Sequence, residues 1–131
     1  MNFRLFVVIA CLLGGLAMLV ASEDAPPEHQ KWMKDLGANL GALRKGVDVE
    51  QNATAMQATL KQIGAFWTKR NSEIAVNSCK ETFQGASSVA KAAQSGDKEG
   101  ISAGMKQIGA GCKGCHDQHR EKVSDTLYRI K

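Results

Sequence analysis

Apolar side chains recur along most of this chain at alternating spacings of three and four residues, the period of an amphipathic helix. Four such stripes follow one another, with short polar stretches between them. The first is expected to begin near His29 and to end near Gly46 and Asp48. The fourth is expected to continue through Val123 and Leu127 to the C-terminus. The stripes are Met33, Leu36, Leu40, Leu43 and Val47; Ala53, Met56, Leu60, Ile63 and Trp67; Val76, Cys79, Phe83, Ala86, Ala90 and Ala93; and Ile101, Met105, Ile108, Cys112 and Cys115.

This pattern predicts an all-α fold, an antiparallel four-helix bundle. Four segments of about 17 to 30 residues, joined by short connections such as 68–72 and 95–97, pack most simply in up-down-up-down order. Both prolines, Pro26 and Pro27, precede the first helix, so no proline interrupts the pattern.

The first 21 residues have the pattern of an export signal. Arg4 supplies a positive charge, residues 6–20 form an apolar run, and Ala21 offers a small residue before a cleavage point. Cleavage would leave residues 22–131 as the mature domain, in the periplasm. The alternatives are an uncleaved anchor, since residues 3–21 are nearly long enough to span a bilayer, and a lipoprotein cut before Cys11, which the short apolar run ahead of it disfavours.

Residues 112–116 read Cys-Lys-Gly-Cys-His, the C-x-x-C-H spacing of a covalent c-type haem attachment site. On a helix, Cys112 and Cys115 lie one turn apart on one face, and His116 falls within the same arc of about 100°. Both sulfurs can then reach the two vinyl groups of one porphyrin while the imidazole reaches its iron. A structural zinc site would need a second pair of ligands, and a thioredoxin-like motif needs a strand pattern that this sequence lacks. The sequence therefore predicts one covalent haem c.

Glycine is frequent inside the predicted helices, although each glycine there costs up to about 1 kcal/mol relative to alanine. Aromatic residues make up only 5% of the chain, so few large side chains can fill the centre. Either the composition has drifted, or small side chains make room for the flat haem, which then supplies the missing apolar volume. The glycines are Gly37, Gly41, Gly64, Gly85, Gly104, Gly109 and Gly111.

The charge balance gives little indication of the partner. The formal net charge is +4, and removal of residues 1–21 would lower it by the charge of Arg4. No clustered basic stripe of the kind that binds nucleic acid is present. Lys106, Lys113 and Lys122 could form a basic rim near the haem for an acidic redox partner.

The chain resembles the cytochrome c′ family, the class II c-type cytochromes, and within it the low-spin, Met-ligated branch. Residues 112–120 (CKGCHDQHR) are similar to the family's C-K-x-C-H-D-x-(aromatic)-R, and residues 33–43 (MKDLGANLGAL) to its M-K-x-(apolar)-G-x-N-(apolar)-G-x-L. The resemblance implies a left-handed bundle with one haem, His116 as the proximal iron ligand and Met33 at the distal position. Two residues depart from the pattern: His29 stands where members often have an arginine near a haem propionate, and His119 replaces the aromatic residue.

The distal ligand has to come from another helix, because the far face of the haem points away from the helix that carries His116. Met105, about 16 Å earlier along that helix, and His119, one turn later, are therefore excluded. The family position favours Met33. His29 remains an alternative ligand or a residue near a propionate, Met56 is expected in the core, and Cys79 is expected to be a buried free thiol.

Three functions fit these observations. The first is a periplasmic electron carrier with His116 and Met33 as iron ligands, which is not an enzyme and exchanges electrons with redox partner proteins. The second is a five-coordinate cytochrome c′ that binds NO or CO, and the third is a haem-containing structural or sensor module. No stable membrane insertion is expected once the signal is cleaved, and both a monomer and a homodimer agree with the resemblance.

Overall fold

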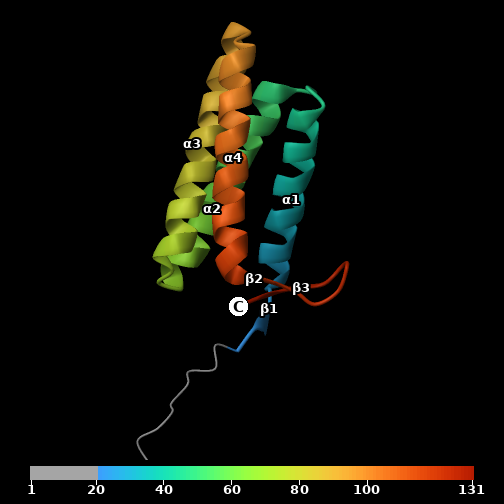
Figure 1. Cartoon of the computed structure of the whole chain (residues 1–131), viewed down its shortest axis with the longest axis vertical. Helices are drawn as coiled ribbons and strands as arrows, with labels where there is room; N and C mark the ends of the chain where they lie inside the picture. Colours follow the sequence, from blue (N-terminus) through green and yellow to red (C-terminus); the bar gives the residue numbers. More distant parts are fainter. Residues whose placement is uncertain (1–20) are drawn as a thin grey trace, which may run out of the picture.

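The computed structural model describes residues 21–131 and consists mainly of four helices. They are α1 (Pro27–Arg44), α2 (Val49–Lys69), α3 (Glu73–Ser95) and α4 (Lys98–His119). The helices run alternately up and down, side by side along one long axis (Figure 1). The predicted antiparallel four-helix bundle is therefore confirmed. The predicted export signal falls almost entirely on residues 1–20, which lie outside the described part.

The helices begin and end where local chemistry favours it. Pro27 is the first residue of α1, where its missing N–H costs nothing. The side chains of Ser72 and Asp97 accept hydrogen bonds from backbone N–H groups in the first turns of α3 and α4. Gly96 ends α3 in the left-handed conformation, with φ of 70°. Each of the two connections on either side of α3 thus carries its own capping residue.

The predicted stripes form most of the core. All five stripe residues of α2 are buried, as are Leu36 and Leu43 of α1, while Met33 and Leu40 are partly buried against them. One expectation was wrong: the Val47 side chain is 50% exposed. Because α1 ends at Arg44, Val47 lies in the connection to α2 and no longer follows the helical period.

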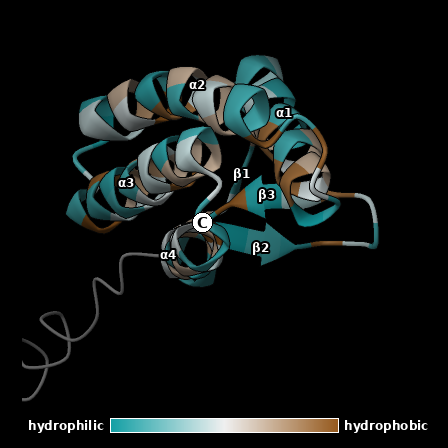
Figure 2. Cartoon of the chain, turned by 90° about the horizontal axis from the view of Figure 1, so that it is seen from above, coloured by the Kyte–Doolittle hydropathy of each residue, from teal (hydrophilic) through white to brown (hydrophobic). Residues whose placement is uncertain are grey.

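The end of the chain also differs from the prediction. α4 ends at His119, and the chain continues as β2 (Arg120–Lys122) and β3 (Tyr128–Ile130) rather than as helix. Together with β1 (Glu23–Asp24) they form an antiparallel sheet of order β1-β3-β2. Figure 2 shows β2 and β3 extending from the end of α4 toward α1.

The physical reason lies in the lengths of the neighbouring helices. α2 ends at Lys69 and α3 begins at Glu73, so a longer α4 would project beyond the bundle with nothing to cover its apolar stripe. Val123 and Leu127 are accordingly exposed, and Ile130 of β3 is the terminal residue that enters the core. We call residues 120–131 the C-terminal strap.

Several of the predicted helix glycines allow α3 and α4 to pack closely against each other. A Cβ atom on Gly104 would lie 2.7 Å from Cγ2 of Val89 and 2.9 Å from the carbonyl oxygen of Gly85. A Cβ on Gly85 would in turn lie 2.8 Å from the backbone nitrogen of Ile108. Around Gly37, Gly41, Gly64 and Gly109 there is open space instead. Room for a haem therefore explains only part of the glycine content.

Replacing Gly104 by alanine should destabilise the haem-loaded protein by about 1–3 kcal/mol, the usual cost of overpacking a tight contact. Gly109→Ala on the same helix is the matched control, because its Cβ meets nothing within 4 Å. That control should be neutral or more stable by up to about 1 kcal/mol, since alanine is the better helix former. Denaturant unfolding followed by circular dichroism measures both. Equal stabilities for the two variants would contradict the tight α3–α4 contact.

Candidate functional site

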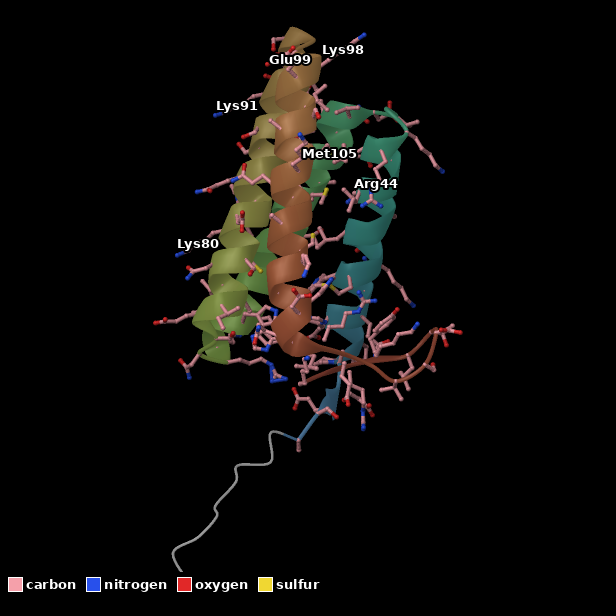
Figure 3. All side chains as sticks on the ribbon, in the orientation of Figure 1. Arg44, Lys80, Lys91, Lys98, Glu99 and Met105 are labelled. Atoms are coloured by element: carbon pink, nitrogen blue, oxygen red, sulfur yellow. The ribbon has the colours of Figure 1, made fainter. Side chains whose placement is uncertain are left out.

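A cavity of about 590 Å³ lies between α1 and α4. The bundle's helix interfaces are α1 with α2, α2 with α3 and α3 with α4, which leaves α1 and α4 facing each other across this space. Sulfur atoms are visible between these two helices in Figure 3. The lining is mostly apolar in its deeper part and polar where the strap crosses it. Lining side chains include His29, Met33, Leu36, Leu40, Met56, Leu60, Ile63, Cys79, Cys112, Cys115 and His116.

Cys112, Cys115 and His116 line the cavity from α4, as their helical spacing predicts. Burial raises the pKa of the Cys115 thiol to about 11, and the charge of Cys112 adds to that rise. The pKa of Cys112 is also raised by burial, although a hydrogen bond with Thr82 opposes the shift. Burial lowers the pKa of His116, so the neutral imidazole that binds a metal is favoured.

Met33 and His29 line the same cavity from α1. His29 is only 7% exposed, and its Nε2 has no hydrogen-bond partner among the described residues. Its ring contacts Phe66 at a centroid distance of 4.9 Å and Trp67 at 6.0 Å. Burial lowers the pKa of His29, and the charge of His116 lowers it further. Buried polar nitrogens usually bond to protein, water or a ligand, and the Nε1 of Trp67, which lines the same cavity, also has no partner among the described residues.

These features together fit a haem. The volume is in the range of cofactor pockets, and Leu36, Leu60 and Ile63 supply the apolar surface that a porphyrin needs. Two cysteine sulfurs, a neutral imidazole on the same helix and a thioether on the facing helix border one space. The residues that the sequence singled out for attachment and for both sides of the iron thus come together here.

Three further sulfur-containing residues were considered from the sequence, and two of them line the cavity. Met56 is fully buried and also borders the cavity. Cys79 is a buried free thiol, as predicted, and burial raises its pKa to about 12. A thiol with such a pKa stays protonated and poorly nucleophilic at neutral pH. Met105 packs against the core without lining the cavity.

The basic rim is weaker than the sequence suggested. Lys113 is in an ion pair with Asp117, and Lys122 with Asp125 at 2.9 Å. Both pairs are exposed, and such pairs typically contribute less than about 1 kcal/mol to stability. Local carboxylates therefore offset two of the three positive charges that the sequence offered as a docking rim.

Sequence reasoning missed the strap residues that line the cavity. Thr126 to Ile130 border it, because the strap folds back across the end of the bundle. The missed signal is the run 122–127, Lys-Val-Ser-Asp-Thr-Leu, which contains two β-branched residues around a Ser-Asp turn pair. The Ser124 hydroxyl accepts a hydrogen bond from the backbone N–H of Leu127 at 3.1 Å, which closes this turn.

Comparison with known proteins gives a family match over the part of the chain that carries the haem motif. A family described as Cytochrome C' matches residues 64–120, from the end of α2 through the haem motif. Cytochrome c′ of Allochromatium vinosum is 24% identical over 139 aligned positions, which cover 82% of this chain and 90% of that protein. No solved structure gives a significant match. Within residues 21–131, no helix is both long and apolar enough to cross a membrane.

Proposed function

We propose that this chain, whose residues 64–120 match the Cytochrome C' family and which is similar to cytochrome c′ of Allochromatium vinosum, is an exported electron carrier with one covalently bound haem c. Cys112 and Cys115 are the attachment residues, His116 is the proximal iron ligand and Met33 is the distal ligand. The observation that carries the proposal is that His116 and Met33 border one cavity from two facing helices. A ligand on each helix is what a six-coordinate iron between them requires.

Each residue has a defined task. Cys112 and Cys115 would hold the group on α4 through two carbon–sulfur bonds, each thiol S–H adding across one vinyl group. The neutral imidazole of His116 would be the proximal ligand, and the Met33 thioether would be a soft distal ligand that favours the ferrous state. When bound, the haem supplies a one-electron couple.

The apolar lining supports the same role. Leu36, Leu60 and Ile63 keep water away from the iron, which raises the reduction potential because a dry site disfavours the more highly charged ferric state. A thioether that occupies the sixth position leaves no open site for a small ligand. Electron exchange with redox partner proteins then needs no bond making at the iron, and the protein performs no catalysis of its own.

The second candidate is a five-coordinate iron that binds NO or CO. It is favoured by the similarity to cytochrome c′ of Allochromatium vinosum, because open iron coordination is typical of the family named there. In that case Met33 would only pack against the haem, as its partly buried position on α1 also permits.

Export completes the proposal. Residues 1–21 would act as a signal that is removed, and residues 22–131 would acquire haem in the periplasm. The family often forms dimers, so the carrier is expected as a monomer or a homodimer.

Absorption spectra of the purified holoprotein in both redox states test the proposal. The ferric protein should be low-spin with the weak far-red band of methionine-ligated iron, and the ferrous protein should bind CO slowly because the thioether must first dissociate. A high-spin ferric spectrum with prompt CO binding would establish the gas-binding function instead. A low-spin spectrum without the far-red band would indicate His29 as the sixth ligand.

A further inference from the structure

The C-terminal strap is fastened to the bundle at several points. The Nε2 of His119 shares a hydrogen bond of 2.7 Å with the Ser72 hydroxyl, and its Nδ1 lies 3.2 Å from the carbonyl oxygen of Lys131. The backbone N–H of Lys131 donates to the carbonyl of His119 at 3.1 Å. The His119 ring also lies against Trp67, with a centroid distance of 4.5 Å. The last residue of α4 thus holds the end of the chain against the bundle.

Strand β1 and the α2–α3 connection hold the strap through further contacts. β1 pairs with β3, Arg129 Nε donates to Asp24 Oδ1 at 2.8 Å, and Arg70 of the α2–α3 connection is in an ion pair with Glu23. Within the strap, the Arg120 guanidinium lies over the Tyr128 ring at 3.5 Å from its centroid. These contacts keep β3 in a fixed position across the mouth of the cavity.

The cavity has a distinct polar end where the strap crosses it. Arg120, Tyr128 and Arg129 line that end, whereas the deeper wall consists of residues such as Leu60 and Ile63. Asp24 engages the Nε of Arg129, and the two terminal nitrogens of this guanidinium have no hydrogen-bond partner among residues 21–131. A guanidinium has five N–H donors, so most of its capacity remains for another acceptor.

A second observation indicates an acceptor at this end. The unpaired Nε2 of buried His29 belongs to the same cavity, and its ring is 6.0 Å from Trp67, the residue against which His119 packs. The protein therefore offers an unpaired imidazole nitrogen and two unpaired guanidinium nitrogens near the strap. Haem is amphipathic, with an apolar macrocycle and two carboxylates on one edge. That edge of the haem supplies acceptors suited to the free N–H donors of Arg129.

We propose that the C-terminal strap closes the cavity over the carboxylate edge of the haem and that Arg129 binds a haem carboxylate. The inference rests on the proposed haem site. Arg129 is a positioning and charge-compensating residue: it holds the haem edge and does not touch the iron. Asp24 in turn orients the guanidinium through its Nε.

The sign of the effect on the reduction potential distinguishes this role from a purely structural one. Loss of a positive charge next to the haem favours ferric iron, so Arg129→Gln should lower the potential. Asp24→Asn breaks the same ion pair but removes a negative charge, so the potential should rise or stay unchanged. If the pair only held the strap in place, both variants would move the potential in the same direction.

The experiment uses holoproteins with covalent haem, with redox titration as the main measurement. Lys122→Gln is the matched charge control, because Lys122 is a strap cation that does not line the cavity and pairs with Asp125. Lys122→Gln should have the wild-type reduction potential. Arg129→Lys, which keeps the positive charge, should have a potential much closer to the wild-type value than that of Arg129→Gln.

Two results would overturn the inference. One is an unchanged potential in Arg129→Gln with intact covalent haem and an unchanged spectrum, which would leave the proposed electron-carrier function standing. The other is a shift of the same sign and size in Asp24→Asn. Wild-type protein without covalent haem would overturn the proposed site as well, whereas wild-type protein with high-spin iron would contradict only the Met33 ligation.

Discussion

Protein in which both Cys112 and Cys115 are replaced by alanine is expected to contain no covalent haem. Each thioether needs one of the two sulfurs, and the third cysteine of the described chain, Cys79, lies on α3 rather than on α4. One sulfur on another helix, outside the C-x-x-C-H motif, cannot replace the two missing sulfurs. Denaturing electrophoresis followed by haem staining measures the result. A stained band from the double variant would contradict the attachment assignment.

The same variant should also lose much of its folded structure. An empty apolar cavity costs roughly 24 cal/mol per Å³ when it cannot collapse. For a cavity of about 590 Å³ this rule sets an upper bound of about 14 kcal/mol, because the cavity is open to solvent on one side, and even part of that cost is large beside the whole stability of a typical domain. The apoprotein should therefore relax by partial detachment of α1, which packs mainly on α2.

Circular dichroism should show reduced helicity and a broad thermal transition for the double variant. Cys79→Ala is the matched control, because it removes a buried cysteine from the same cavity without touching the C-x-x-C-H motif. The control should retain stained haem and a cooperative transition. A cooperative transition of the apoprotein at the holoprotein's temperature would show that the bundle packs without its cofactor.

Helical periodicity predicted the bundle well because each stripe has a neighbouring helix to bury it. The α2 stripe is the clearest case: its residues from Ala53 to Trp67 are all buried. The prediction failed at Val47 and beyond His119, where apolar residues keep the helical spacing but no facing helix remains. Periodicity alone gives no information about where a partner surface ends.

The candidate site was likewise predictable only in part. The covalent attachment residues follow from local spacing, since Cys112, Cys115 and His116 belong to one helix. That Met33 borders the same cavity required the family resemblance, because core methionines on other helices have the same periodicity. The contribution of the strap could not be predicted, since it depends on β1 and β3 pairing across more than 100 residues of sequence.

His119 illustrates why a departure from a motif is hard to interpret from sequence. An aromatic residue was expected there, and the histidine left its partners undefined. In the structure its ring packs on Trp67 as an aromatic residue would, at 4.5 Å between centroids. Its two nitrogens additionally contact Ser72 and the carbonyl oxygen of Lys131. The substitution therefore keeps the packing and adds the fastening of the strap.

Replacing Met33 by leucine is expected to convert the iron from six-coordinate low-spin to five-coordinate high-spin. Leucine has nearly the volume of methionine, and such swaps usually cost less than about 1.5 kcal/mol, so the bundle should stay folded. The far-red band should disappear, the reduction potential should fall with loss of the soft thioether, and ferrous protein should bind CO promptly.

Met56→Leu provides the matched control for this change, because Met56 lines the same cavity from α2 and is fully buried. Its spectrum, potential and slow CO binding should match those of the wild type, which separates iron ligation from general packing effects in the cavity. Absorption spectra and CO mixing kinetics on the two variants measure the difference. If Met33→Leu stays low-spin while His29→Ala becomes high-spin, the unpaired Nε2 of His29 is the ligand, and the carrier has two histidines on its iron.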